Sequence, residues 1–126
     1  MEQHIADALT QGGVVDITTI GRTTGHPRRI EIYFHHFDGG YFITGRPGRR
    51  RDWLANMAAN PDFTLHLKRG IQADLPARAE EITDPEERAT IIFRILTESW
   101  NSTPAEAKAQ LGTWVENAPL IRFSLA

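Results

Sequence analysis

The sequence predicts an α+β fold in which about six short, mostly antiparallel strands form a curled sheet or small barrel with peripheral helices. Two observations predict this class: tight turns join the strand-like segments, and helical segments do not alternate regularly with strands. A third observation concerns domains. The 126 residues contain no repeat, linker or low-complexity segment, so we expect residues 1–126 to form a single domain.

The N-terminal region predicts one short helix and one strand. Residues 2–10 place apolar side chains on one helical face, and Gly12 and Gly13 end that helix. VVDITTI (14–20) is rich in β-branched residues, which favour strands, and the turn-forming stretch GRTTGHP follows it. We therefore expect a strand that leads into a tight turn.

A hairpin is predicted next. Apolar and polar residues alternate along RIEIYFHHF (29–37), with Tyr33 and His35 on the polar side, which is typical of a half-buried strand. Asp-Gly within DGG (38–40) supplies the positive φ angles of a tight turn, and YFITG (41–45) returns as the antiparallel partner.

The rest of the chain predicts three helices and three strands. These are a short helix around Trp53 that stops at Asn60 and Pro61, strands at 62–70 and 72–82, a helix that Asp84 caps, a helix from Thr103 to about Glu116, and a C-terminal strand at 119–125. Asp84, Pro85 and Glu87 form an N-terminal capping pattern. Because Pro76 has no backbone N–H, it predicts an edge or bulged position for the strand at 72–82.

Charge is unevenly distributed, although the formal net charge is only −2. Half of the 14 lysine and arginine residues lie in one stretch that contains only two acidic residues, Glu31 and Asp38. These seven are Arg22, Arg28, Arg29, Arg46, Arg49, Arg50 and Arg51. The first half of the chain therefore predicts an anionic partner.

Several classes of protein are excluded. The chain has no cysteine, which excludes disulfides, thiolate catalysis and zinc–thiolate sites and fits a cytoplasmic protein. No metal site is expected, because His35 and His36 leave opposite faces of one strand and the other histidines are scattered. No serine lies in a nucleophile motif, and no glycine-rich nucleotide fingerprint is present. There is neither a secretory signal nor an apolar run long enough to span a membrane.

The loop GRPGRRRDW (45–53) leaves a strand and enters a helix. Backbone N–H groups at the helix start and several guanidinium groups can therefore converge on one anion, and phosphate suits that geometry best. A basic loop whose charges simply point into water is one alternative. Nucleic-acid binding is another, but neither a recognition-helix pattern nor stacking aromatics on a basic strand appear, so no nucleic acid is expected as partner.

The ordered combination of motifs resembles a known family. TTIGRTTGHPR (18–28), a strand, DGG, a second strand, the basic loop, Trp53 and ANP (59–61) follow one another as in the deazaflavin (F420)-dependent nitroreductases. That family is related to the flavin-mononucleotide-binding split-barrel oxidoreductases. The resemblance implies a split β-barrel, usually a homodimer, that binds F420, with FMN as the alternative cofactor. It also implies hydride transfer between the cofactor and a small organic substrate such as a quinone or nitroaromatic.

The resemblance also implies which residues bind the cofactor. They are Arg28, Thr44, Gly45, Arg46, Gly48, Arg49, Arg50, Arg51 and Trp53. Thr23 stands where the family commonly has lysine, and the three consecutive arginines are expected to supply that charge from the other side. Tyr33 and His35 are candidate proton donors, since both lie on the polar side of a central strand. A noncatalytic split-barrel module that binds a flavin or another anionic small molecule is the rival hypothesis.

Overall fold

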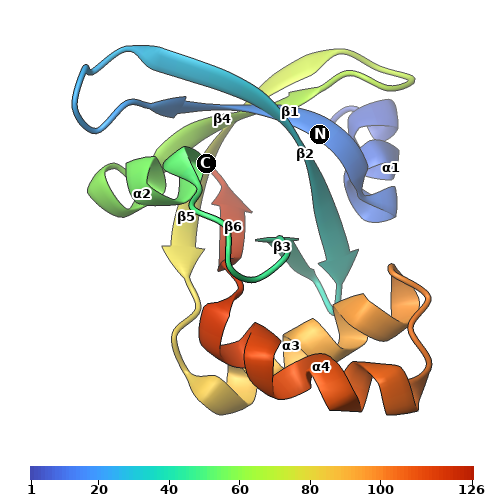
Figure 1. Cartoon of the computed structure of the whole chain (residues 1–126). Helices are drawn as coiled ribbons and strands as arrows, with labels where there is room; N and C mark the ends of the chain where they lie inside the picture. The colour runs from blue at the N-terminus through green and yellow to red at the C-terminus, as the bar shows by residue number, and fades with distance from the viewer.

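The computed structural model describes all 126 residues and contains a closed, six-stranded antiparallel β-barrel with four helices around it (Figure 1). The predicted α+β split-barrel class is confirmed, and every predicted helix and strand is present. In chain order they are α1 Gln3–Gln11, β1 Gly13–Ile20, β2 Pro27–Phe37, β3 Gly40–Thr44, α2 Asp52–Ala59, β4 Asp62–Leu67, β5 Ala73–Glu81, α3 Pro85–Glu98, α4 Pro104–Asn117 and β6 Leu120–Leu125. No helix is both long and apolar enough to cross a membrane.

The strand order around the barrel is β1-β2-β3-β6-β5-β4, and β4 closes the ring by pairing with β1. β1 and β2 pair along the whole of β1, from Gly13 opposite Phe34 to Ile20 opposite Pro27. The pairing of β1 with β4 extends only from Asp16 to Thr18. As a result, the turn end of the β1–β2 hairpin projects beyond the barrel, at the upper left of Figure 1.

Pro76 does not lie on an edge strand, so that prediction was wrong. β5 pairs with both β4 and β6 inside the closed barrel. The carbonyl of Pro76 accepts a hydrogen bond from the N–H of Ala126, and the ladder with β6 begins one residue later, at Ala77. The missing N–H of Pro76 therefore faces the end of β6, where the ladder loses no hydrogen bond.

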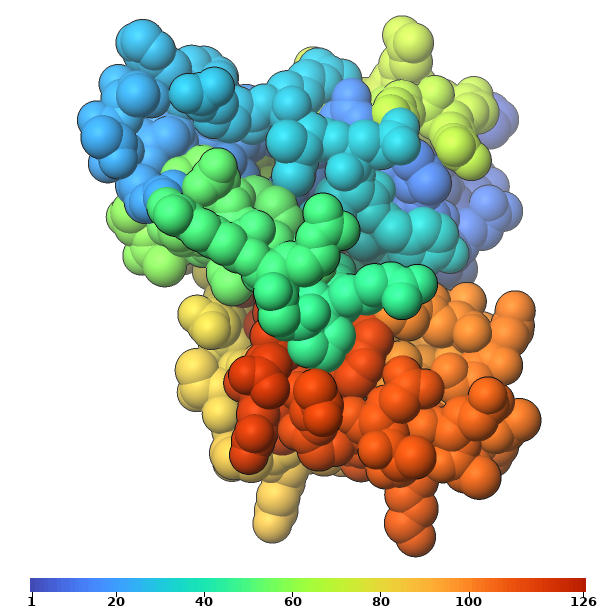
Figure 2. Space-filling model, in the orientation of Figure 1, coloured from blue at the N-terminus to red at the C-terminus, as the bar shows by residue number.

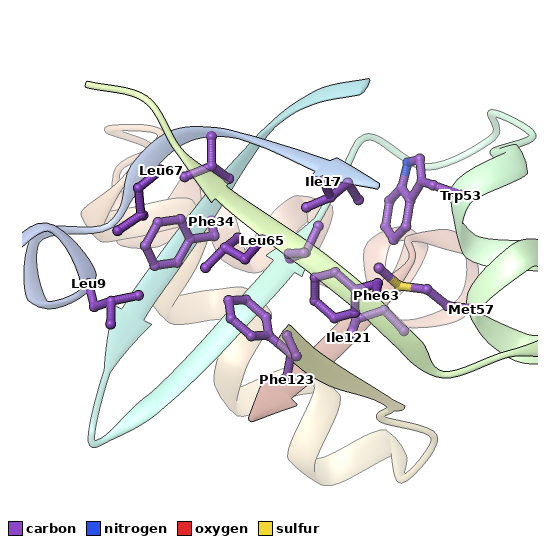
Figure 3. Close-up of a cluster of buried hydrophobic side chains, with 13 residues drawn as sticks. Leu9, Ile17, Phe34, Trp53, Met57, Phe63, Leu65, Leu67, Ile121 and Phe123 are labelled. Carbon is purple, nitrogen blue, oxygen red and sulfur yellow. The ribbon is translucent and has the colours of Figure 1, made fainter. Parts of the chain in front are cut away.

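The barrel interior is one hydrophobic cluster (Figure 3). Inward residues of the strands, such as Ile17, Phe34 and Leu65, fill its middle. Leu9 of α1 lies at one end of the cluster, and Trp53 and Met57 of α2 lie at the other. Burying an aliphatic or aromatic side chain of this size stabilises the folded state by about 1.5–3 kcal/mol, so the barrel fixes the position of α2.

A second hydrophobic cluster lies outside the barrel, beneath α3 and α4. Side chains alternate along β3, so Ile43 belongs to the interior cluster whereas Phe42 belongs to the outer one. Ile92 and Ile95 of α3 and Trp114 of α4 pack into the same outer cluster. The helical layer at the bottom of Figure 1 therefore covers only part of the barrel wall.

Candidate functional site

The projecting end of the β1–β2 hairpin and the first turns of α2 enclose a cavity of about 480 Å³. Asn56 of α2 ties the two elements together: its amide nitrogen donates to Thr19 Oγ1 at 3.1 Å. Its Oδ1 accepts from both the backbone N–H and the guanidinium of Arg22, each at 3.1 Å. The buried Asn56 side chain therefore sets the distance between hairpin and helix.

Arg28 is the cation of this cavity that lacks an anionic partner. Arg22 pairs with Asp52 at 3.5 Å and Arg29 pairs with Asp16 at 3.0 Å. No carboxylate lies within 4.0 Å of Arg28, and its side chain lines the cavity beside Trp53. The cavity therefore presents one exposed guanidinium that can take an external anion.

The arginine loop, residues 45–51, joins β3 to α2. Gly48 has a φ of 81°, which only glycine adopts easily. At Gly45 a Cβ atom would lie 2.5 Å from Nη2 of Arg51, because the Arg51 guanidinium folds back over this residue. Arg51 also donates to the carbonyl of Arg49 at 3.1 Å. Burial, and to a smaller extent the charge of Arg49, lowers the pKa of Arg51. Arg51 thus stabilises the conformation of the loop through contacts with other residues of the loop.

None of the four arginines in this loop has a carboxylate within 4.0 Å, and Arg46, Arg49 and Arg50 are exposed. Six of the ten lysines and arginines outside the loop form ion pairs, namely Arg22, Arg29, Lys68, Arg78, Arg94 and Arg122. Asp52, the acidic residue next to the loop, pairs with Arg22 on the hairpin. The positive charge of the arginine loop is therefore left unneutralised by the protein.

The guanidinium groups of the loop do not converge on one point, which differs from the sequence prediction. Arg46 lines a groove of about 970 Å³ together with Trp100, and Arg49 lines another of about 880 Å³ together with Leu54. Figure 2 shows the loop, in green, between the hairpin above and α4 below, with side chains that extend to both sides. This spread suits an extended anion better than a single phosphate.

Two further predicted cofactor residues have structural contacts of their own. The Thr44 hydroxyl is buried and donates to the carbonyl of Pro119 at 2.5 Å, on the side of the outer cluster. Trp53 is buried in the barrel cluster, although part of it lines the hairpin cavity. Cofactor contacts by Thr44 and Trp53 stay predictions.

The two candidate proton donors differ sharply in environment. Tyr33 is 48% exposed, and its ring centroid lies 4.9 Å from that of His35. His35 is only 5% exposed, because the corner between α3 and α4 covers it, and its Nδ1 lies 3.1 Å from Ser99 Oγ. Burial lowers the pKa of His35 to about 4. His35 therefore lies on the predicted polar side of β2 but is shielded from solvent.

This burial makes folding stability depend on pH. The folded-state pKa of His35, about 4, lies below its unfolded value of 6.5, so the unfolded chain binds a proton first as the pH falls. The stability that depends on an uncharged His35 is fully present above pH 6.5 and is lost as the pH falls towards 4. In urea titrations, the free energy of unfolding should fall by about 2 kcal/mol more in the wild type than in His35→Gln when the pH is lowered from 7 to 5. Equal losses in the two proteins would show that folding does not lower the pKa of His35.

Sequence reasoning missed one part of this face, the corner of residues 99–102 between α3 and α4. Ser99 bonds to His35, and Trp100 lies beneath Arg46 with 5.5 Å between the guanidinium carbon and the ring centroid. A tryptophan between two helix caps was the available signal, but its contact with the arginine loop depends on tertiary packing. The corner thus contacts His35 through Ser99 and the arginine loop through Trp100.

The model of a protein family described as F420H(2)-dependent quinone reductase matches residues 2–115. The chain belongs to this family. It is an F420-dependent oxidoreductase, as the resemblance implied, and F420 rather than FMN is the cofactor of the matching family. Family membership also favours an enzyme over the noncatalytic binding module.

Solved structures share the fold of this quinone reductase family member at low sequence identity. A conserved hypothetical protein from Mycobacterium tuberculosis is 17% identical, with a TM-score of 0.77 over 99% of this chain and 80% of the other. A structure described as an F420-H2 dependent reductase is 23% identical, with a TM-score of 0.62 over 89% of this chain and 94% of the other. A putative 5-nitroimidazole antibiotic resistance protein from Bacteroides thetaiotaomicron is 15% identical, with a TM-score of 0.68 over 99% and 80%.

Proposed function

We propose that the protein reduces quinone-type acceptors with reduced F420, and that Arg28 and the arginine loop hold the anionic parts of the cofactor. Bound F420 supplies the hydride. The protein therefore has to bind and orient the cofactor and tune its electrostatic environment, and it does not have to provide a nucleophile. Nitroaromatic compounds are a second acceptor class, which the 5-nitroimidazole resistance protein of the same fold supports.

The observation that carries the proposal is the set of arginines without carboxylate partners. F420 carries a phosphate and a polyglutamate tail, and guanidinium groups bind both phosphate and carboxylate through charge-assisted hydrogen bonds. Arg28 on the hairpin and Arg46, Arg49 and Arg50 on the loop provide such donors, and no protein carboxylate competes for them. The chemistry of these donors fits the cofactor.

The spread of the loop suggests a division of roles. Arg46 and Arg49 line different grooves, so Arg28, Arg49 and Arg50 can hold the phosphate and the tail while Arg46 faces a separate groove. Arg51 orders the loop over Gly45 and leaves external contacts to its neighbours. This arrangement supports the expectation that the consecutive arginines replace the cation missing at Thr23.

Of the two candidate proton donors, Tyr33 is the better placed. Its exposed phenol can exchange protons with water, whereas His35 is neutral at pH 7 and already faces Ser99. We assign His35 the role of positioning the α3–α4 corner.

A homodimer is also part of the proposal. β2 exposes two large side chains, Ile30 at 37% and Tyr33 at 48%, which lie on opposite faces of the strand. A partner subunit that packs against the Ile30 face of β2 would bury Ile30 and leave the Tyr33 phenol exposed. Light scattering coupled to size exclusion should give about twice the chain mass of 14.2 kDa.

The decisive experiment titrates the purified protein with F420 and with FMN side by side, and then mixes it with reduced F420 and a naphthoquinone. We expect tight binding of F420, weaker binding of FMN, and quinone-dependent reoxidation of reduced F420. Binding of F420 without reoxidation by any quinone or nitroaromatic would show a binding module instead. Preference for FMN would contradict the cofactor assignment for this chain.

A further inference from the structure

The groove of about 970 Å³ beside Arg46 has an unusual lining for a cofactor-tail site. Arg46 is its sole charged residue, and Ser99, Asn101, Ser102, Gln110 and Thr113 contribute neutral polar groups. Its aromatic surface comes from Trp100 and Trp114. A polyglutamate tail needs several cations, whereas this groove offers a ring surface and a single guanidinium.

The backbone around Trp100 keeps part of its side chain exposed to solvent. Its backbone N–H donates to the carbonyl of Ile95 at 3.2 Å, and that of Ser102 donates to Leu96 at 3.0 Å. Asn101 between them has a φ of 53°, so the chain turns sharply directly after Trp100. The corner thereby presents Trp100 with 38% of its surface exposed.

The orientation of the Trp100 ring is fixed as well. The ring meets that of Trp114 edge-on, with centroids 4.7 Å apart and an angle of 77° between the planes. Trp114 itself is buried in the outer cluster, so it provides a rigid support. An exposed, immobilised indole is a preorganised stacking surface for a planar ring, since little conformational freedom is lost on binding.

Arg46 adds the electrostatic element. Its guanidinium carbon lies over the Trp100 ring, 5.5 Å from the centroid, so a planar ligand stacked on the exposed remainder of the ring lies beside this cation. Reduced F420 would supply a hydride to the quinone and release a proton to solvent; the quinone then becomes a hydroquinone monoanion, which takes up one proton from solvent to give the hydroquinone. The guanidinium stabilises the negative oxygen that forms in this step.

We propose that this groove, between the arginine loop and the α3–α4 corner, binds the quinone-type acceptor, and that Trp100 is its stacking platform. The inference rests on the proposed function and adds the place where the acceptor binds. Arg46 belongs to the loop that holds the cofactor and also lines the groove, so the acceptor and cofactor sites adjoin.

Trp100→Ala and Trp100→Phe test the proposal. In Trp100→Ala we expect the KM for a naphthoquinone to rise about tenfold, since an aromatic stacking contact is lost, while the Kd for F420 stays within about twofold of wild type. Trp100→Phe keeps a ring and should recover most of the acceptor affinity. Because Trp100 packs against Trp114, thermal unfolding checks that both variants are folded at the assay temperature.

The outcomes separate the two proposals. An unchanged quinone KM in Trp100→Ala, with normal F420 binding, would overturn the acceptor groove and leave the proposed function intact. A weakened Kd for F420 with an unchanged quinone KM would overturn it too, since the groove would then hold the cofactor. If the wild-type protein failed to bind F420, the proposed function would fail first and this inference with it.

Discussion

Replacing Arg49 and Arg50 together with glutamine should weaken F420 binding at least tenfold. Both side chains are exposed and neither has a carboxylate partner, so their charge is available to an external anion. A hydrogen bond to a charged group contributes about 1.5–3 kcal/mol, and about 1.4 kcal/mol corresponds to a factor of ten in Kd. Fluorescence titration of F420 measures the effect.

A matched control removes the same charge elsewhere. Arg69→Gln with Arg78→Gln also removes two exposed arginines, one in the turn after β4 and one on β5. F420 affinity should stay near that of wild type in this control. Added salt should weaken binding to the wild type more than to the loop variant, because fewer ionic contacts remain to be screened. Equal losses of F420 affinity in the loop variant and the control would show that the arginine loop does not bind the cofactor.

Arg88→Met should destabilise the folded protein by about 3–5 kcal/mol. Arg88 is 8% exposed, and its guanidinium donates to the carbonyls of Ile82 and Val115, at 2.8 and 2.9 Å, and to that of Ala118. Methionine keeps much of the apolar volume but leaves three carbonyls between β5, α3 and α4 without this donor. Urea denaturation followed by circular dichroism measures the loss.

Two companion variants make the Arg88 result specific. Arg88→Lys keeps the charge but offers a single nitrogen, so it should fall between wild type and Arg88→Met. Arg78→Met removes an exposed arginine whose partner is Asp62, and it should change stability little. A loss in Arg88→Met no larger than in Arg78→Met would mean that water satisfies the three carbonyls.

Local signals in the sequence were sufficient for the secondary structure. Asp84 accepts from the backbone N–H of Glu87, as its capping pattern indicated, and the predicted helix from Thr103 begins with a complete capping box of Thr103 and Glu106. Asp38 and Gly39 adopt the positive φ angles expected of the hairpin turn. These features depend on residues close in sequence, so one chain suffices to predict them.

Features that depend on contacts between distant segments were predicted less well. Pro76 was expected at an edge because the position of the end of β6 cannot be known from β5 alone. His35 was expected to be polar and accessible, but a corner 64 residues further along the chain covers it. The charge of the arginine loop was predictable from composition, whereas the inward fold of Arg51 over Gly45 was not.

The separation of the two hydrophobic clusters bears on how the enzyme can diversify. Side chains that fill the barrel and set the position of α2 belong to one cluster, and those beneath α3 and α4 belong to the other. Mutations at exposed positions of the helical layer therefore leave the packing of the barrel cluster and α2 undisturbed. A library confined to the residues between 99 and 113 that are not buried, with Ala107 and Trp114 kept, should yield folded variants with altered acceptor preference.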